Sequence, residues 1–245
     1  PAAADLVRRH DLARLLREGG GLARIPGFLP DGVARRARAA LLEAPARRWE
    51  RTSTAEREDS GYADSIPHDF RLLEVEGDGV LLGVARLLWR LVPHSLPNFT
   101  AAMYGPADHI APHDDSVREQ YTWQEVVELA KNYSTSSQKC DQFGLSPWAG
   151  SRAFRRDTAA VYYLTDDWPE DIGGLFVDLE SGEKIKPEFN TLLVFSVPRM
   201  HMVTAVEAIH ARRLSLFGWW LTPAPGPAAG GCGAVAPRAG KRPAA

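Results

Sequence analysis

A change of pattern near Phe99 limits the folds open to this chain more than any other feature of its sequence. From there to residue 221, apolar residues fall in short β-rich runs separated by turn-forming residues. The predicted strands are residues 99–104, 159–164, 175–179, 191–196, 201–206 and 213–221. Six short strands with few helices between them predict a sandwich or barrel.

The first 98 residues carry helical signals and form a predicted helical lead-in. Apolar residues recur at helical spacing in 6–16, Pro30-Asp31 opens a segment that runs to about residue 44, and a third helix follows Asp78. Residues 47–70 are polar, charged and interrupted by proline, which predicts an irregular connection. The expected fold class is therefore mainly β with N-terminal helices, an α+β arrangement.

Two further segments differ from the strand series. Residues 116–157 interrupt it with a predicted helix at 123–133 and a stretch rich in Ser, Gly and Pro at 134–150, and this length suggests a lid or binding loop. Residues 223–245 are almost all Pro, Ala, Gly and basic residues, which predicts a disordered tail. We expect one domain over 1–222, with its β core at 99–222.

Charge and cysteine content limit the partners and the compartment. With 29 basic and 31 acidic residues, the net charge of −2 creates no global field toward nucleic acid or a membrane. The best apolar run, 80–92, is broken by Arg86 and Arg90, so no membrane span is expected. Cys140 and Cys232 lack metal-ligand spacing and favour an intracellular protein, cytoplasmic or nuclear, although one disulfide stays open.

A predicted metal site begins with His113 and Asp115, which lie two residues apart in Pro-His-Asp-Asp-Ser. In an extended chain this spacing places both side chains on one face, with Asp114 on the other. Two imidazoles and one carboxylate leave open metal positions, an arrangement typical of non-haem Fe(II) oxygenases. His201 is the best second histidine because it opens an apolar strand, and His210 is the alternative.

Arg213 stands in an otherwise apolar strand and needs an anion. A guanidinium can hold a carboxylate by two parallel bonds, and so fix a dicarboxylate whose other end chelates the metal. Ordinary explanations exist as well: Arg213 could pair with Glu207, and Tyr104 and Tyr163 could be half-buried sheet tyrosines. The order of these residues within one series of strands favours a joint site.

The stretch from Tyr104 to Trp220 resembles the Fe(II)/2-oxoglutarate prolyl hydroxylases. It looks most like the ribosomal-protein prolyl hydroxylase branch and is more distantly similar to the oxygen-sensing prolyl hydroxylases. The residues that carry the resemblance are His113-Asp-Asp115, Val161-Tyr-Tyr-Leu-Thr-Asp-Asp-Trp168, Gly173-Gly174-Leu, Lys186-Pro-Glu-Phe-Asn, Leu193-Val-Phe, His201-Met-Val and Arg213-Leu-Ser-Leu-Phe-Gly-Trp-Trp.

This resemblance implies a double-stranded β-helix (jelly-roll) core and a dioxygenase that hydroxylates a prolyl residue in a protein or peptide. It implies Fe(II), 2-oxoglutarate and O₂, with ascorbate as reductant. The implied site residues are His113, Asp115 and His201 as metal ligands, Arg213 as the anchor of the distal carboxylate, and Tyr163, Tyr104, Ser215 and Arg156 around 2-oxoglutarate. The retained carboxylate of Asp115 favours hydroxylation, because related halogenases lack it.

Two departures from the family pattern leave the substrate open. Residues 116–157 form a much longer segment than in those hydroxylases, and the second, non-catalytic β-helix domain of the ribosomal branch is absent. A free amino acid or another small molecule is therefore an alternative substrate, whereas near-neutral charge disfavours a nucleic acid. A non-catalytic binding domain and a sugar-binding β-sandwich are alternatives of another class, but the second leaves the His, Asp and Arg pattern unexplained.

Overall fold

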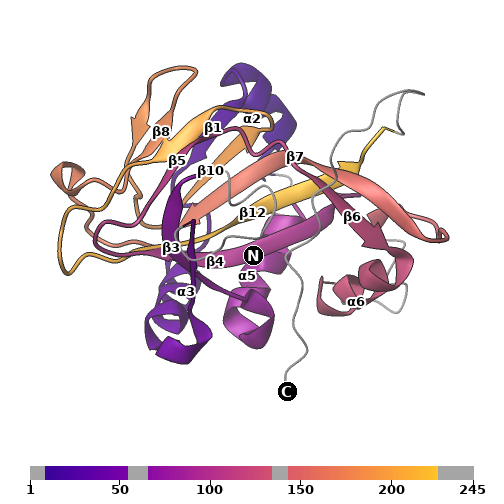
Figure 1. The fold of residues 1–245 in the computed structure, drawn as a ribbon, viewed down its shortest axis with the longest axis horizontal. Coiled ribbons are helices and arrows are strands. Elements are labelled where there is room, and N and C mark those ends of the chain that lie inside the picture. The colour runs from indigo at the N-terminus through magenta and orange to yellow at the C-terminus, as the bar shows by residue number, and fades with distance from the viewer. Residues whose placement is uncertain (1–8, 55–65, 134–142, 226–245) are drawn as a thin grey trace.

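The computed structural model describes residues 9–54, 66–133 and 143–225, and a strongly curled antiparallel sheet dominates it (Figure 1). Hydrogen-bonded neighbours follow the order β1-β10-β7-β12-β4-β3-β5-β11-β8-β9, with β2 beside β3 and β6 beside β7. The strands are β1 (Leu22–Ile25), β2 (Glu50–Ser53), β3 (His68–Leu73), β4 (Leu96–Tyr104), β5 (His109–His113), β6 (Arg118–Thr122), β7 (Ser151–Tyr163), β8 (Phe176–Asp178), β9 (Lys184–Ile185), β10 (Thr191–Ser196), β11 (His201–Val203) and β12 (Arg213–Pro223).

Two of the helices begin at aspartates whose side chains accept hydrogen bonds from the first amides. Asp78 accepts hydrogen bonds from the amides of Val80 and Leu81, and Asp11 accepts one from the amide of Arg14. The described helices are α2 (Leu12–Glu18), α3 (Asp31–Glu43), α5 (Gly79–Trp89) and α6 (Trp123–Tyr133), with short 3₁₀ turns η1 (Ala46–Arg48), η2 (Val75–Gly77) and η4 (Glu170–Ile172). None of these helices has the length and hydrophobicity that a membrane span needs.

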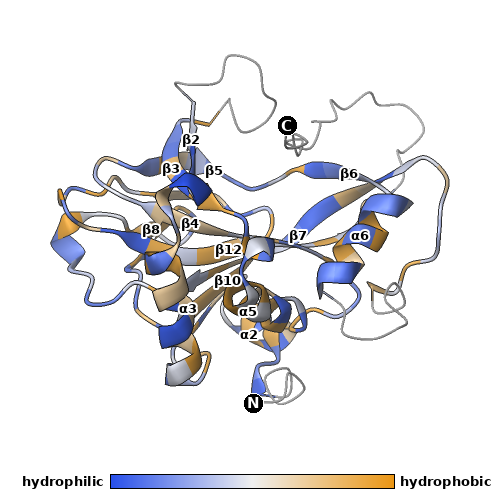
Figure 2. Cartoon of the chain, turned by 90° about the horizontal axis from the view of Figure 1, so that it is seen from below, coloured by the Kyte–Doolittle hydropathy of each residue, from blue (hydrophilic) through white to orange (hydrophobic). Residues whose placement is uncertain are grey.

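Successive side chains of β12 point alternately into the main hydrophobic core and toward the inner side of the curled sheet. Leu214 and Leu216 belong to the main cluster, which they share with residues of α3 and α5, and Figure 2 shows these helices lying against the sheet. Trp220 joins this cluster, and its indole Nε1 donates to the carbonyl of Trp89 in α5 over 3.2 Å. The intervening residues Arg213 and Ser215 therefore face the opposite, inner side of the curled sheet.

The curl brings strands together that are not neighbours in the sheet. The ring of His201 on β11 lies 4.7 Å from that of Phe195 on β10, although five other strands separate β10 from β11 in the hydrogen-bonded order. Strands β5, β11 and β8 thus fold over β10, β7, β12 and β4. This is the jelly-roll arrangement, and it confirms the predicted mainly β fold class.

Each of the six predicted strands is present, but several bounds differ. Strand β10 has the predicted limits, whereas β7 begins at Ser151, well before the expected residue 159. The predicted helix at 6–16 is wrong in its limits, because the chain leaves the helical conformation at His10 and Asp11, and α2 starts at Leu12. Residues 6–8 of that prediction lie outside the described part, as do residues 1–5.

The prediction of an irregular connection over residues 47–70 is wrong near both ends of that segment. Strands β2 and β3 occupy them and pair in antiparallel register, with Thr52 opposite Phe70. Both strands are short and carry charged residues, so neither shows the clean alternation of apolar and polar residues that predicts a strand. Strands β1, β5, β6 and β9 were not predicted either, and residues 55–65 lie outside the described part.

Much of the expected lid at 116–157 is regular structure. Strand β6 pairs with the early part of β7, from Arg118 opposite Arg155 to Thr122 opposite Ser151, and the predicted helix is α6. The segment thus extends the sheet, and Figure 1 shows β6 and α6 together at one end of it. Residues 134–142, including Cys140, lie outside the described part.

The predicted start of the C-terminal tail at Pro223 is slightly early. Strand β12 ends at Pro223, and the amide of Ala224 donates to the carbonyl of Ala153 over 2.9 Å. The extended β7 provides this partner, which an isolated reading of the Pro- and Ala-rich sequence could not reveal. Residues 226–245, and Cys232 with them, lie outside the described part.

Candidate active site

The side chains of His113, Asp115 and His201 converge at one point inside the curled sheet. His113 ends β5, His201 begins β11, and the two are direct partners across that strand pair. Nε2 of His113 lies 3.5 Å from Oδ1 of Asp115, and Nε2 of His201 lies 3.7 Å from Oδ2. One candidate ligand atom from each residue lies within 4.8 Å of the others.

Both imidazoles are oriented by backbone carbonyls. Nδ1 of His113 lies 2.9 Å from the carbonyl of Ala111, and Nδ1 of His201 lies 2.8 Å from that of Arg199. A carbonyl only accepts hydrogen bonds, so each Nδ1 carries the proton and each Nε2 keeps a lone pair. Both lone pairs are therefore available on the side that faces Asp115.

Asp115 reaches this point through a turn. Its φ is +62°, in the left-handed region that Asp tolerates better than most residues, whereas β5 has already ended at His113. The expectation that an extended spacing of two aligns the side chains was wrong in its geometry. Burial raises the pKa of Asp115, but the contact with His113 and the nearby His201 and Arg156 together outweigh burial and lower this pKa to about 2.

His201 is held in an aromatic slot. Its ring stacks on Phe176 at 5.0 Å with an interplanar angle of 18°, and Phe195 covers it at 4.7 Å. Burial lowers the pKa of His201 against the opposing influence of Asp115, so the ring is neutral at neutral pH. A neutral imidazole is the form that binds a metal.

Arg213 forms a second polar centre on the same inner side of the sheet. It is 2% exposed, and its guanidinium lies 4.7 Å from the ring centre of Tyr104 and 5.1 Å from that of Tyr163. Arg213 Nε, the Tyr163 hydroxyl and the Ser215 hydroxyl are buried without a well-formed hydrogen bond among the described residues. Such groups usually have partners, so this cluster has the donors for an anion.

The surroundings of Arg213 keep the two tyrosine hydroxyls protonated and leave room for close packing around the guanidinium. Burial raises the pKa of Tyr104 and of Tyr163 although the charge of Arg213 opposes it, so both hydroxyls stay available as donors. Gly174 allows the close approach of Trp168, because a Cβ there would lie 2.8 Å from Trp168 Cζ2 and 3.4 Å from Arg213 Cδ. Its φ of +65° also disfavours any other residue.

Arg156 lies on the other side of Asp115, with its guanidinium NH1 3.8 Å from Oδ1. The guanidinium stacks 3.4 Å from the ring centre of Trp219, and its Nε donates to Glu119 over 3.1 Å. Asn98 donates to both carboxylate oxygens of Glu119. The sequence analysis missed Glu119 because it belongs to β6, a strand that was not predicted. Its burial, which is rare for a carboxylate, is visible only in the structure.

The residues weighed as alternatives lie elsewhere. His210 is exposed, and among the described residues the potential metal-binding group contains His201 instead. Glu207 is exposed, whereas Arg213 is buried, so the alternative in which Arg213 pairs with Glu207 does not account for it. Asp114 points away to cap its own turn, where it accepts from the amide of Ser116.

The donor set fits a divalent transition metal. Two imidazoles and one carboxylate, grouped on one side, leave the other positions open for small ligands. The unpartnered donors around Arg213 fit a carboxylate, since a guanidinium and hydroxyls can bind it together. The two centres face the same interior, as a chelating dicarboxylate requires.

Comparison with known proteins supports this assignment at the level of a family. A family model described as the 2OG-Fe(II) oxygenase superfamily matches residues 99–221. This range includes β4 to β12 and therefore every candidate site residue. No curated protein matches the chain in a sequence search.

Solved structures with the same fold include hydroxylases and an epimerase. A prolyl-4-hydroxylase from Pseudomonas putida is 20% identical, with a TM-score of 0.52 over 90% of this chain and 98% of that one. A prolyl hydroxylase from Trichoplax adhaerens, in complex with a hypoxia-inducible-factor peptide fragment, is 15% identical, with a TM-score of 0.56 over 89% and 90%. The non-heme alpha-ketoglutarate-dependent epimerase SnoN from nogalamycin biosynthesis is 15% identical, with a TM-score of 0.51 over 89% and 81%.

Proposed function

The chain belongs to the 2OG-Fe(II) oxygenase superfamily, and we propose that it hydroxylates a prolyl residue in a protein or peptide. As a 2-oxoglutarate-dependent dioxygenase it uses Fe(II), 2-oxoglutarate and O₂. In the proposal, His113, Asp115 and His201 hold the iron, and Arg213 binds the distal carboxylate of 2-oxoglutarate with help from Tyr163, Tyr104 and Ser215.

One observation carries the assignment of these residues. A group of two histidines and an aspartate shares an interior with a buried arginine, and three polar atoms of this arginine and its neighbours lack a well-formed hydrogen bond among the described residues. Either centre alone has an ordinary explanation in a β protein. Together they fit the two ends of one chelating dicarboxylate, a substrate that joins a metal to a guanidinium.

When bound, the iron and 2-oxoglutarate supply the oxidising chemistry, in which decarboxylation to succinate and CO₂ accompanies oxidation of a substrate carbon. The chain positions the reactants. His113 and His201 present Nε2 lone pairs, Asp115 adds one negative charge, and the buried inner face excludes bulk water from the reacting atoms.

A prolyl substrate is supported by three observations. The motif series from Tyr104 to Trp220 resembles prolyl hydroxylases, and a Trichoplax enzyme of similar fold was solved with a peptide. Phe217 and Trp219 lie on the same inner side of β12 as Arg213 and provide apolar surface that suits a pyrrolidine ring. In the proposal, Arg156 and the β6–α6 extension shape the entrance for the polypeptide, for which ribosomal-protein peptides are the first candidates.

Turnover with peptides tests the proposal. The purified chain, given Fe(II), ascorbate and 2-oxoglutarate, is incubated with a panel of prolyl peptides from ribosomal proteins and with matched peptides in which alanine replaces proline. Succinate is measured by NMR, and the peptides are measured by mass spectrometry. Asp115→Asn is the inactive control, and Arg24→Gln, in an exposed pair with Glu188, is the matched surface control.

We expect succinate formation that rises with the prolyl peptides, together with the gain of one oxygen atom on proline. Turnover of 2-oxoglutarate that no peptide stimulates, but that a free amino acid or another small molecule does, would replace the prolyl substrate and keep the oxygenase. No turnover and no binding of 2-oxoglutarate would leave a non-catalytic binding domain.

A further inference from the structure

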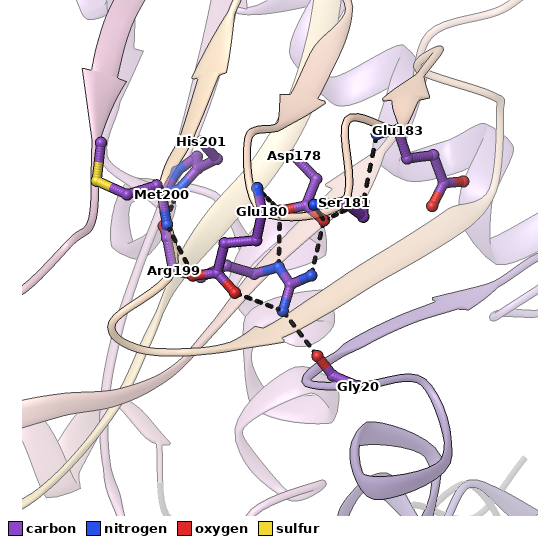
Figure 3. Close-up of polar contacts among 8 residues, drawn as sticks. All are labelled: Gly20, Asp178, Glu180, Ser181, Glu183, Arg199, Met200 and His201. Atoms are coloured by element: carbon purple, nitrogen blue, oxygen red, sulfur yellow. Dashed lines mark hydrogen bonds and ion pairs between the residues drawn. The ribbon is translucent and has the colours of Figure 1, made fainter.

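A buried ion pair lies directly behind one of the proposed iron ligands. Nε and NH2 of Arg199 donate to the two carboxylate oxygens of Asp178 over 2.9 and 2.7 Å (Figure 3). Asp178 is fully buried and Arg199 is 6% exposed. Asp178 ends β8 and is the direct cross-strand partner of His201. Charged pairs in such places are expensive to bury, so a function beyond stability is reasonable.

Further hydrogen bonds hold this pair in place. Asp178 also accepts from the hydroxyl and the amide of Ser181 and, more weakly, from the amide of Glu180, all in the turn that joins β8 to β9. NH1 of Arg199 donates to the carbonyl of Gly20, in the turn between α2 and β1, over 2.9 Å. The guanidinium is thereby fixed to two turns that lie far apart in the sequence, as Figure 3 shows.

The main chain of Arg199 touches both segments that carry the proposed ligands. Its carbonyl is the acceptor for Nδ1 of His201 at 2.8 Å, and its amide donates to the carbonyl of Asp114 at 3.3 Å. Asp114 is the residue between His113 and Asp115. One peptide segment therefore sets the orientation of an imidazole and supports the turn that bears the carboxylate.

A contrast with the other histidine shows why a side-chain anchor is needed. The carbonyl that orients His113 belongs to Ala111 within β5, and the amide of Ala111 donates to the carbonyl of Pro67 over 2.7 Å. Arg199 lies between β10 and β11, outside any regular element. Its carbonyl has no strand pairing to hold it, and the side-chain bonds to Asp178 and Gly20 take that role.

We infer that Arg199, clamped by Asp178, is a positioning residue that fixes the tautomer and the direction of His201 for metal binding. The inference rests on the proposed iron site. Residues that orient a metal-binding histidine usually change metal affinity by about 10- to 100-fold when they are replaced. A purely structural clamp would instead change stability and leave the metal affinity as it is.

The test compares Asp178→Asn and Arg199→Lys with the wild type. Asp178→Asn turns an acceptor toward the guanidinium into a donor, and Arg199→Lys keeps the charge but loses the two parallel bonds. Asn190→Ala is the matched control, because Asn190 is buried and bonds to Leu29 and Tyr162 away from the site. It should lower the melting temperature without touching His201.

Two readouts separate this inference from the proposed function. The first is long-range ¹H–¹⁵N NMR of the histidines in metal-free protein, which reports the tautomer of His201. The second is the dissociation constant of Co(II), with its visible absorption spectrum. We expect wild type and Asn190→Ala to show the Nδ1–H tautomer and the same affinity, and both clamp variants to show a mixture of tautomers and roughly 10- to 100-fold weaker binding.

Clamp variants that keep the wild-type tautomer and Co(II) affinity would overturn the inference and leave the proposed function intact. A wild type that binds no Co(II) would sink the proposed iron site, while the tautomer in the metal-free variants would still decide what the clamp does. If Asp178→Asn fails to fold, Arg199→Lys and Ser181→Ala, which removes one bond to Asp178, give the same two readouts.

Discussion

His113 and His201 face each other across strands β5 and β11, with ring centres 4.1 Å apart. The register of that strand pair, more than any contact in the sequence neighbourhood, creates the candidate metal site. A shift of one residue in either strand would turn one imidazole to the other side of the sheet. The buried aromatic slot around His201 gives the register its specificity.

Arg213→Lys is expected to weaken the binding of 2-oxoglutarate by about 10- to 100-fold. A lysine keeps the charge but loses the two parallel bonds to a carboxylate, and a charge-assisted bond contributes about 1.5–3 kcal/mol. Calorimetric titration of 2-oxoglutarate into the Mn(II)-loaded protein measures the change. Arg35→Lys, in an exposed pair with Asp31, should bind like wild type, and an unchanged Arg213→Lys would refute the anchor.

Tyr163→Phe should separate affinity from stability. The Tyr163 hydroxyl is buried without a well-formed bond among the described residues, so its removal should leave the unfolding free energy of metal-free protein unchanged or slightly raised. Binding of 2-oxoglutarate should weaken by about tenfold, as for the loss of one hydrogen bond. A clear loss of stability with normal binding would assign the hydroxyl to folding instead.

Asp115→Asn should abolish tight metal binding and keep the fold. Asparagine tolerates the left-handed backbone that φ of +62° requires, whereas Asp115→Ala adds strain to the loss of charge. Thermal unfolding should therefore rank the metal-free variants with Asn above Ala, while both lose Co(II) binding. Equal unfolding temperatures would show that the turn carries no strain.

Glu119→Ala is expected to destabilise the metal-free protein by about 2–4 kcal/mol. The variant removes the buried carboxylate to which Arg156, Asn98 and the hydroxyl of Tyr121 donate. Denaturant unfolding measures the effect. Glu188→Ala, which removes the exposed partner of Arg24, should cost less than about 1 kcal/mol, and equal losses would contradict the importance of the buried network.

Asp178 should contribute stability that depends on pH. Burial would raise its pKa, but the bonds from Arg199 and Ser181 lower it to about 2. A lowered pKa stabilises the fold above the unfolded value near 4, and this contribution disappears as the pH falls through about 2. Wild type should exceed Asp178→Asn by on the order of 2 kcal/mol more at pH 5 than at pH 2, and a constant difference would contradict the lowered pKa.

The sequence predicted the central strands well because their residues are buried on both sides. Strand β10, Thr191–Ser196, lies between β1 and β7 under the helices and is a continuous apolar run, so its limits were correct. Strands at the margin of the sheet, such as β2 and β6, begin with two consecutive charged residues and lack a continuous apolar run. Their pairing partners lie far along the chain and are not visible from local pattern.

The residues of the candidate site were predicted from their types and their order in the sequence. The geometry of the site was not predicted. The structure brings together His113, Asp115 and His201, but through a left-handed turn at Asp115 that no spacing rule describes. Glu119 was missed since its role depends on β6 pairing with β7. Arg199 was missed because an arginine in the connection between two strands belongs to no recognisable sequence pattern. Its role becomes visible only when the fold places it beside Asp178.

An anaerobic titration of 2-oxoglutarate into the Fe(II)-loaded protein, followed by visible absorption, tests the central claim most directly. Chelation of Fe(II) by the keto acid produces a charge-transfer band, so the account predicts a saturable band in the wild type. It predicts no band in His201→Ala and a normal band in the exposed variant His210→Ala. A wild type that binds both Fe(II) and 2-oxoglutarate without the band, or a normal band in His201→Ala, would contradict the proposed iron site.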